Sequence, residues 1–247
     1  MIPAYNEAAR ISSTLAVVTE YLSRQAYEYE VLVVDDGSED STTEVVRRAY
    51  PDVMVISYPT NRGKGYAVKM GMLAAQGEYR VYYDADGSTP IEELNNLWPL
   101  FEAGTDIVIG SRALPESRID VHQSWVRENM GRAYNATLRL FGLTRFSDTQ
   151  CGFKGFTKDA AESLFPLLTM NRFSFDAELL FLAEKQGFRI QEIPVRWLNS
   201  PDSRVRLFVD SARMLCGAAA IRIKWTLGCY SRHEPLGQNQ TTKHGSG

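Results

Sequence analysis

The sequence has few of the residues that build disulfide, zinc or serine–histidine sites. Its 247 residues include three cysteines and three histidines. Cys151, Cys216 and Cys229 are odd in number and widely spaced, so they form neither a disulfide framework nor a CxxC metal pair, which favours a reducing compartment. The histidines are equally scattered. We therefore expect carboxylates, rather than histidine or zinc, to carry any catalysis.

An excess of positive charge and a long apolar run are also absent. The formal net charge is −3, which gives no electrostatic support for binding nucleic acid. No uninterrupted run of about 18 apolar residues predicts a transmembrane helix, and no signal-peptide pattern is present. With 44% hydrophobic residues, the chain is long enough for one large α/β domain.

Hydrophobic periodicity predicts strands that alternate with helices over the first 110 residues. Ile11, Leu15, Val18 and Leu22 recur at helical spacing, and residues 30–34 form a β-branched run typical of a buried parallel strand. Further helices are expected at 41–49, 66–75 and 91–101, and further strands at 53–57, 79–83 and 106–110. The first strand, before Pro3, is expected to be short or trimmed. This alternation predicts a doubly wound, mostly parallel sheet of the Rossmann-like α/β class.

Polar clusters fall where these strands end. They are Tyr5 with Glu7, Asp35 with Asp36, Asp84 with Asp86, and Ser111 with Arg112. Ligands of doubly wound sheets bind outside the carboxyl ends of the strands. This coincidence is the main signal for a site that comes from the residues alone.

Asp84 and Asp86 are separated by one residue just past a hydrophobic strand. Two such carboxylates can share Mg²⁺ or Mn²⁺, which favour a few carboxylates together with phosphate oxygens of a substrate. The alternative is a solvated turn, in which aspartate is common. The position at the end of a central strand favours the metal site.

Two further loops have both a ligand-binding and a purely local interpretation. Residues 35–38 can hydrogen-bond a ribose or base, or Ser38 or Asp40 can cap the next helix. Residues 61–65, Asn-Arg-Gly-Lys-Gly, have neither Walker nor GxGxxG spacing, so a reductase using NAD is disfavoured. Lys64 is a candidate for phosphate contact, and the glycines alternatively serve only a tight turn.

Eight motifs together resemble family 2 glycosyltransferases, which have the GT-A fold. The resemblance covers about residues 2 to 225. The motifs beyond residue 147 are similar to the dolichyl-phosphate β-glucosyltransferase branch, of which the dolichyl-phosphate mannose synthases are close cousins. In order, the motifs occupy residues 3–7, 34–38, 61–65, 84–86, 110–112, 148–154, 175–178 and 193–197.

The resemblance implies a role for each matching position. Asp84 and Asp86 would hold Mg²⁺ or Mn²⁺ and the diphosphate, and Ser203-Arg204 would close over that diphosphate. Ser88 stands where a further polar neighbour of the metal is often found. Whether the protein supplies a third ligand to the metal is therefore left open. The residues expected to bind the nucleotide sugar are Pro3, Tyr5, Glu7, Asp35 or Asp36, Lys64 and Gln150.

Five arginines follow the strand at 106–110, and two of them are candidates for the acceptor's phosphate. We choose Arg112 and Arg127, because arginine matches phosphate oxygens with two parallel hydrogen bonds; a solvated basic helix face is expected for most of the others. Asp176 begins a helix expected at 173–182. The helix dipole alone favours an acidic residue there, whereas the resemblance sets Asp176 beside the sugar and acceptor.

The segment from Arg206 to Trp225 is predicted to be an amphipathic helix. Arg206, Arg213 and Lys224 share one stripe, and most apolar residues, Trp225 among them, lie on the other side. Such a helix suits an anionic membrane surface, or alternatively packs on its own domain. We expect a catalytic domain at 1–205, this helix at 206–232 and a disordered tail at 233–247.

The predicted activity is an inverting transfer of a hexose from a nucleotide sugar to a polyprenyl or dolichyl phosphate. The resemblance favours UDP-glucose over GDP-mannose as donor, and cytosolic placement at a membrane surface. Three alternatives stay open: a mannose synthase, a family 2 transferase to a hydroxyl with Asp176 as base, and an inactive nucleotide-sugar sensor. The intact Asp84–Asp86 pair argues against the last.

Overall fold

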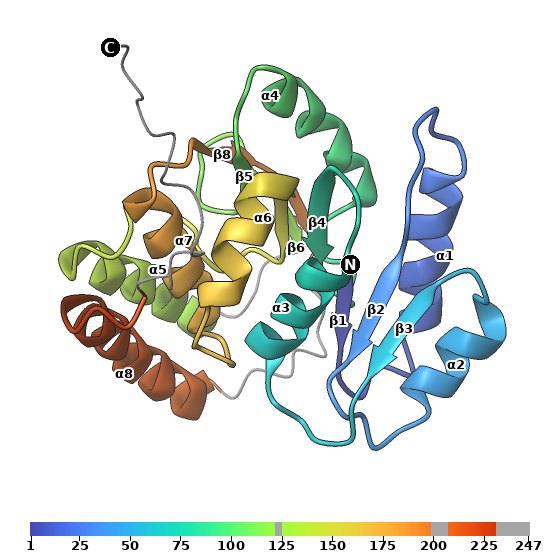
Figure 1. Ribbon diagram of the computed structural model, residues 1–247, viewed down its shortest axis with the longest axis horizontal. Coiled ribbons are helices and arrows are strands. Elements are labelled where there is room, and N and C mark those ends of the chain that lie inside the picture. Colours follow the sequence, from blue (N-terminus) through green and yellow to red (C-terminus); the bar gives the residue numbers. More distant parts are fainter. Residues whose placement is uncertain (122–124, 199–206, 231–247) are drawn as a thin grey trace, which may run out of the picture.

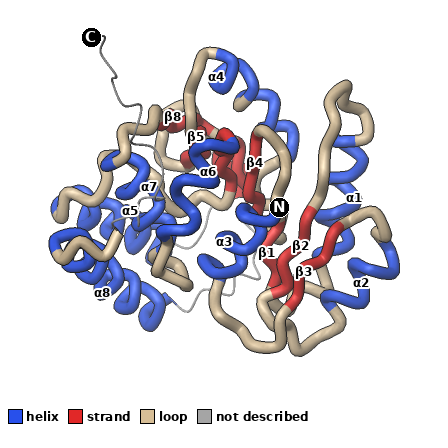
Figure 2. Tube along the Cα trace, in the orientation of Figure 1, coloured by secondary structure: helices blue, strands red, loops and turns tan. Residues whose placement is uncertain are grey.

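The computed structural model describes residues 1–121, 125–198 and 207–230 (Figure 1). Strands occupy the middle of the molecule and helices surround them (Figure 2). In chain order the elements are β1 (Ile2–Ala4), α1 (Ile11–Leu22), β2 (Leu32–Asp35), α2 (Thr42–Ala49), β3 (Met54–Ser57), α3 (Lys64–Ala74), β4 (Tyr79–Tyr83), η1 (Ile91–Asn96), α4 (Trp98–Glu102), β5 (Ile107–Ser111), β6 (Arg118–Val121), α5 (Trp125–Leu140), β7 (Phe153–Thr157), α6 (Lys158–Leu164), η2 (Phe165–Leu167), α7 (Phe175–Lys185), β8 (Ile190–Pro194), β9 (Arg196–Leu198) and α8 (Leu207–Thr226).

The central sheet is mostly parallel, as predicted. Strands β1, β2 and β3 pair in parallel, and β4, β7, β5 and β8 pair in that order. Backbone hydrogen bonds from Met1 to Val81 (2.7 Å) and from Tyr83 to Met1 (3.0 Å) join the two groups through β1 and β4. Strand β7 runs antiparallel to both of its neighbours, so the sheet is mixed rather than uniformly wound.

The two faces of the sheet support two apolar cores. Successive side chains of a strand point to opposite faces. Accordingly Tyr82 and Ile107 lie in the core beneath α3, α6 and α7, whereas Tyr83 and Val108 lie in the core beneath α1, α2 and α4. The strands of an α/β sheet are hydrophobic on both faces for this reason, which explains the continuous apolar runs in the sequence.

The predicted helices were confirmed with one change. The single helix expected at 91–101 is a 3₁₀ helix over Ile91–Asn96 followed by α4 over Trp98–Glu102. Pro99 stands in the first turn of α4. Proline is tolerated in a first turn, where its missing N–H is not needed, but it interrupts the hydrogen bonds of a longer helix.

Helix α8 forms as predicted, but its sides differ from the predicted wheel. Met214, Ala218 and Ile221 are buried against the core, whereas Leu215 and Ile223 are exposed. The predicted wheel grouped Met214, Ala218, Leu215 and Ile223 on one side, and that grouping is wrong. Arg206 of the predicted basic stripe lies outside the described residues.

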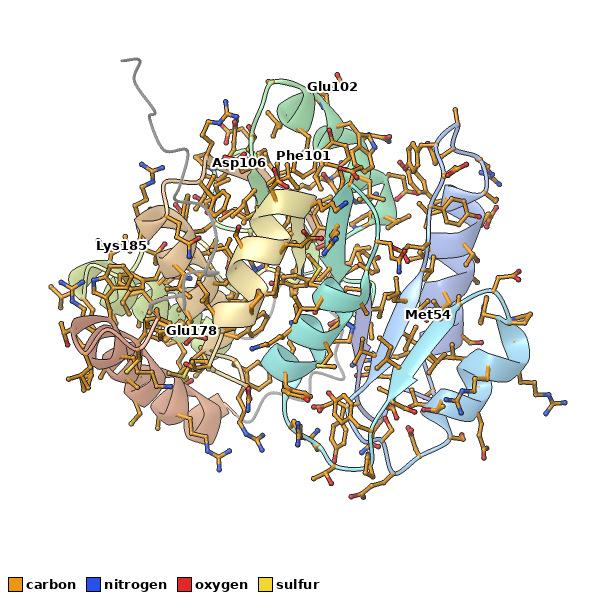
Figure 3. The ribbon with its side chains drawn as sticks, viewed as in Figure 1. Met54, Phe101, Glu102, Asp106, Glu178 and Lys185 are labelled. Carbon is orange, nitrogen blue, oxygen red and sulfur yellow. The ribbon has the colours of Figure 1, made fainter. Side chains whose placement is uncertain are left out.

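Two contacts join the end of α8 and the residues just after it to α7 and the segment before α7. The Lys224 ammonium donates to Thr169 Oγ1 at 2.8 Å, so this lysine turns toward the domain. Glu178 of α7, labelled in Figure 3, is fully buried and accepts a hydrogen bond from the Tyr230 hydroxyl at 2.7 Å. Within the described ranges, none of the helices is both long and apolar enough to span a bilayer.

Candidate functional site

The loops that follow β1 and β2 are joined at the carboxyl edge of the sheet. The Asp36 N–H donates to the Ala4 carbonyl at 2.8 Å, and the Asn6 N–H donates to Ser38 Oγ at 2.9 Å. Asn6 adopts a φ of 55°, in the left-handed region that asparagine tolerates better than most residues. The clusters that the sequence predicted at these two strand ends therefore form one surface.

Asp36 organises the loop that leads to Lys64. Its Oδ1 accepts from the Tyr58 hydroxyl and the Arg62 N–H, and its Oδ2 accepts from the Gly63 N–H, each at 2.8 Å. The Asp36 carboxylate and burial together raise the pKa of Tyr58, which keeps that phenol protonated. With both oxygens engaged and 3% exposure, Asp36 holds the loop in shape.

Asp35 is engaged in the same way with the loop before α2. It accepts hydrogen bonds from Ser38 and, at 2.9 Å, from the Thr43 hydroxyl. The local interpretation of residues 35–38 therefore holds at least in part. The predicted nucleotide contacts of Asp35 and Asp36 stay predictions.

Lys64 and Asp84 form an ion pair across the site. The Lys64 Nζ lies 2.6 Å from Asp84 Oδ1, and the two side chains are 21% and 30% exposed. Burial disfavours the charged lysine, but the carboxylates of Asp84, Asp176 and Asp86 outweigh that effect and raise the Lys64 pKa. The structure thus brings the glycine-rich loop and the two-aspartate motif into direct contact.

The position of Asp84 is limited by Gly152, the residue just before β7. Its N–H donates to the Gly152 carbonyl at 3.0 Å. A Cβ atom on Gly152 would lie 1.9 Å from Asp84 Oδ2, far closer than atoms can approach. Only glycine fits at position 152 while Asp84 keeps this orientation.

The carboxylates of Asp84 and Asp86 suit a hard divalent cation. Both are half-buried, and Asp86 Oδ1 accepts from the Ser88 N–H at 3.0 Å. The Ser88 hydroxyl is buried and has no hydrogen-bond partner. Among the described residues, no group of three or more His, Cys, Asp or Glu side chains gathers. Two carboxylates with a hydroxyl nearby fit Mg²⁺ or Mn²⁺, whose other ligands are typically water and substrate phosphate.

Asp176 lies in a buried network at the first turn of α7. Its Oδ1 accepts from the Tyr82 hydroxyl and from the Lys154 Nζ at 2.8 Å. Lys154 is fully buried and also donates to Tyr82 and to the Cys151 carbonyl, both at 2.6 Å. Asp176 is therefore a fixed, paired carboxylate close to the Lys64–Asp84 pair.

Arg112 is held by Asp148 at the end of β5. The guanidinium donates from Nε at 2.6 Å and from Nη2 at 2.9 Å to the two carboxylate oxygens, and it lies over the Trp197 ring. Burial favours neutral Asp148, but Arg112 outweighs it and lowers the Asp148 pKa to about 2. Gln150 donates its side-chain amide to the Met214 sulfur at 3.7 Å, linking this motif to α8. The acceptor role of Arg112 stays a prediction.

The other predicted residues are distributed as follows. Pro3 is buried in β1, Tyr5 is half-buried, and the Glu7 carboxylate is buried in an ion pair with Arg10. Arg127 lies on α5, but its side chain is outside the described part of the structure, as are Ser203 and Arg204 altogether.

A groove opens between the segment before α7 and the start of α8. Its volume is about 370 Å³. It combines cationic and apolar side chains, among them Arg62, Arg172, Arg213, Met170, Phe173 and Met214. Arg62 belongs to the glycine-rich loop, and its own N–H donates to Asp36, so the groove borders that loop.

Sequence reasoning missed Lys154, Tyr82 and Gly152 as components of the site. Gly152 and Lys154 had a signal, because both lie inside the motif at 148–154. Tyr82 had none, since its importance depends on which atoms the fold brings within a few ångströms.

Comparison with known proteins finds a matching family and several similar relatives. Residues 1–165 match the family described as "Glycosyl transferase family 2". A dolichyl-phosphate beta-glucosyltransferase of Trichomonas vaginalis is 37% identical over 220 residues, which cover 84% of this chain and 65% of that protein. Those of Saccharomyces cerevisiae and Homo sapiens are each 32% identical, with 93% of this chain and 75% and 76% of those proteins covered. The chain thus spans about two thirds to three quarters of these relatives.

A solved structure shares the fold at lower sequence identity. It is glucosyl-3-phosphoglycerate synthase from Mycobacterium tuberculosis in complex with Mn²⁺, UDP and phosphoglyceric acid. Its TM-score is 0.70 at 20% identity, with 90% of this chain and 76% of that chain covered. The match supports the GT-A architecture predicted from the motifs.

Proposed function

The chain belongs to glycosyltransferase family 2, and we propose that it transfers glucose from UDP-glucose to a dolichyl or other polyprenyl phosphate. The reaction inverts the anomeric configuration and yields a polyprenyl-phosphate glucose and UDP. The observation that carries the proposal is the shared name of relatives 32% to 37% identical over most of this chain, which are dolichyl-phosphate β-glucosyltransferases.

The proposed chemistry is a single displacement at the sugar. An oxygen of the lipid phosphate attacks the anomeric carbon, and the bond from that carbon to the β-phosphate oxygen of UDP breaks, so that UDP leaves with the electron pair. Asp84 and Asp86 would hold Mg²⁺ or Mn²⁺, which when bound stabilises the negative charge of the leaving diphosphate. Lys64, 2.6 Å from Asp84, is in reach of the same diphosphate. The predicted contribution of Ser203 and Arg204 concerns residues outside the described ranges.

The surroundings of Asp176 favour a phosphate acceptor over a hydroxyl acceptor. A phosphate oxygen is already anionic at neutral pH and needs no strong base, whereas a hydroxyl must lose a proton. Asp176 is buried and already accepts hydrogen bonds from Lys154 and Tyr82. Both contacts are made to Oδ1, so this oxygen could take a proton from a substrate only by giving up one of them. We assign Asp176 to orienting the sugar or acceptor.

The groove beside α8 supports an amphipathic acceptor. An isoprenoid phosphate presents an anionic head and an apolar chain, and the groove offers arginines together with methionine and phenylalanine side chains. Arginine pairs with phosphate oxygens through two parallel hydrogen bonds, and methionine adapts to irregular apolar shapes.

We also propose that α5 and α8 face the membrane that contains the acceptor. The two helices pack on each other. Trp125 and Leu140 of α5 are 77% and 83% exposed, and Ile223 of α8 is 56% exposed. Exposed apolar side chains of this size, with arginines close by, are typical of helices that lie in a membrane interface.

A transfer assay tests the proposed reaction. Purified protein is incubated with Mn²⁺ or Mg²⁺, a polyprenyl phosphate in detergent, and radiolabelled UDP-glucose or GDP-mannose in separate reactions. We expect label from UDP-glucose in the organic phase, lost with EDTA and in Asp86→Ala. Label transferred from GDP-mannose and not from UDP-glucose would show that GDP-mannose is the donor. Transfer only to a saccharide hydroxyl would overturn the lipid-phosphate acceptor.

Sedimentation with lipid vesicles tests the membrane face. We expect binding to phosphatidylcholine vesicles that contain phosphatidylserine, and weaker binding of Ile223→Asp. Val17→Asp on α1 is the matched control, since Val17 is also about half exposed, at 51%, but lies on another helix. Equal binding of both variants and the unchanged protein would contradict this orientation.

A further inference from the structure

Lys64 has two possible partners in the proposed reaction, and they compete. Its ammonium lies 2.6 Å from Asp84 Oδ1. Asp84 is also one of the two carboxylates assigned to the divalent cation. We propose that the Lys64 ammonium is the counter-ion of the metal-free site, which leaves Asp84 when a divalent cation binds and moves to the donor's diphosphate. This inference rests on the proposed use of a nucleoside diphosphate donor with Mg²⁺ or Mn²⁺.

The ammonium and the metal cannot both stay against Asp84 at low cost. A divalent cation bound to Asp84 would stand a few ångströms from the ammonium, and like charges at that separation repel strongly in a half-buried site. Asp84 cannot retreat from the two cations toward β7, because Gly152 packs against its Oδ2 on that side. One of the two cations has to move.

Lys64 is the cation that can move without disturbing the fold. The backbone before it is fixed, because Asp36 accepts from the N–H groups of Arg62 and Gly63. Lys64 begins α3, so its Cα is held, whereas its four-carbon stem has several rotatable bonds and is 21% exposed. A swing of the side chain transfers the ammonium to a neighbouring anion.

The diphosphate supplies that anion. A nucleoside diphosphate at this edge offers oxygens to the metal and to the ammonium at once. Its oxygens therefore replace the Asp84 carboxylate as the partner of the Lys64 ammonium. Metal and nucleotide then bind cooperatively, and by reciprocity each tightens the other by the same factor. In this way Lys64 keeps the affinity of the site for the divalent cation low until the donor is bound.

Mn²⁺ titration followed by electron paramagnetic resonance of the free ion tests the inference without any transfer reaction. We expect Lys64→Met to bind Mn²⁺ alone about tenfold more tightly than the unchanged protein, the size of one like-charge contact at a partly exposed site. The factor by which UDP tightens Mn²⁺ should fall in the same variant. Lys64→Arg keeps the charge and should still bind Mn²⁺ alone weakly.

Two controls separate this result from general charge effects. Lys158→Met also removes a lysine from an ion pair, 3.5 Å from Glu78 and away from the site, and should leave Mn²⁺ binding unchanged. Asp84→Asn should weaken Mn²⁺ binding in every background. Thermal unfolding followed by circular dichroism checks that each variant is folded.

Either of two results would overturn the role of Lys64. One is Mn²⁺ alone binding to Lys64→Met no more tightly than to the unchanged protein; the other is an equal UDP effect in both. The outcome is independent of the acceptor. Failure of lipid transfer with the expected Mn²⁺ result would reject the proposed reaction and leave this inference standing.

Discussion

Asp35 and Asp36 stand at the end of β2, and Asp84 and Asp86 stand just after β4, so both pairs of carboxylates meet the carboxyl edge of the sheet. The first pair is buried, and its oxygens accept hydrogen bonds from the loops around them. The second pair is half-buried, and Asp84 is paired with the Lys64 side chain. The same residue type at the same edge of the sheet therefore fixes loops in one place and is assigned to a ligand in the other.

The partners of the two pairs distinguish carboxylates that hold loops from carboxylates assigned to a ligand. Asp36 accepts the N–H groups of Arg62 and Gly63 in a loop distant in sequence, and these donors cannot leave without unfolding that loop. The N–H that Asp86 accepts belongs to Ser88 in the same turn, and Asp84 is paired with a lysine, which exchanges for an ion of higher charge at lower cost. The following predictions test this distinction.

The largest effect is expected from the pair after β4. Asp86→Ala should lower kcat/KM for lipid transfer by at least about 100-fold, because a metal contributes several kcal/mol of charge stabilisation. Its free energy of unfolding should change little, since the N–H that Asp86 accepts belongs to Ser88 in the same turn. Radiolabel transfer and urea denaturation measure the two quantities. The exposed Asp52→Ala is the control, and equal activity of both variants would remove Asp86 from the site.

The pair after β2 should give the opposite result. Asp36→Ala removes the acceptor of three donors, from Tyr58, Arg62 and Gly63. We expect the free energy of unfolding to fall by about 3 kcal/mol, because each buried donor left without a partner costs about 1 kcal/mol or more. Urea denaturation of Asp36→Ala beside Asp86→Ala measures this contrast. A smaller loss of unfolding free energy in Asp36→Ala than in Asp86→Ala would contradict the structural role that we assign to Asp36.

Gly152→Ala tests whether the orientation of Asp84 matters for the reaction. The added methyl group would collide with Asp84 Oδ2 and push that carboxylate aside. We expect transfer activity to fall by roughly 10- to 100-fold, since displacements of about 1 Å at a reacting centre have effects of this order. Gly131→Ala on α5 is the control, because nothing lies within 4 Å of its added Cβ. Full activity of Gly152→Ala would mean that Asp84 is free to adjust.

The smallest effect concerns Asp148, a buried carboxylate paired with an arginine. Its pKa is lowered from 3.8 to about 2 in the folded protein, so its charge contributes stability above about pH 4, and that contribution is lost as the pH falls through about 2. We expect Asp148→Asn to cost about 2 kcal/mol more at pH 6 than near pH 2. Urea denaturation at the two pH values measures it. A pH-independent difference would show that the Arg112 pair adds no charge stabilisation.

Much of the fold followed from local patterns in the sequence. The helix at 11–22 and the strand at 79–83 were predicted with the bounds that the structure has. Strands β7 and β8 were not predicted. Residues 153–157, Phe-Lys-Gly-Phe-Thr, contain a lysine and a glycine, both unfavourable in an isolated strand. Their place between β4 and β5 is determined by long-range pairing that no short segment encodes.

Local sequence patterns were sufficient for the order of strands and helices over the first 110 residues, the polar clusters at the strand ends and the candidate metal ligands. These depend on hydrophobic periodicity and on residue chemistry, which are local. Only the tertiary structure decided that Asp36 holds a loop, that Lys64 is paired with Asp84, and that Lys154 is buried against Asp176. Partner choice depends on which side chains the fold brings within about 3 Å of each other, and residues as far apart in sequence as Gly152 and Asp84 meet only once the sheet has formed.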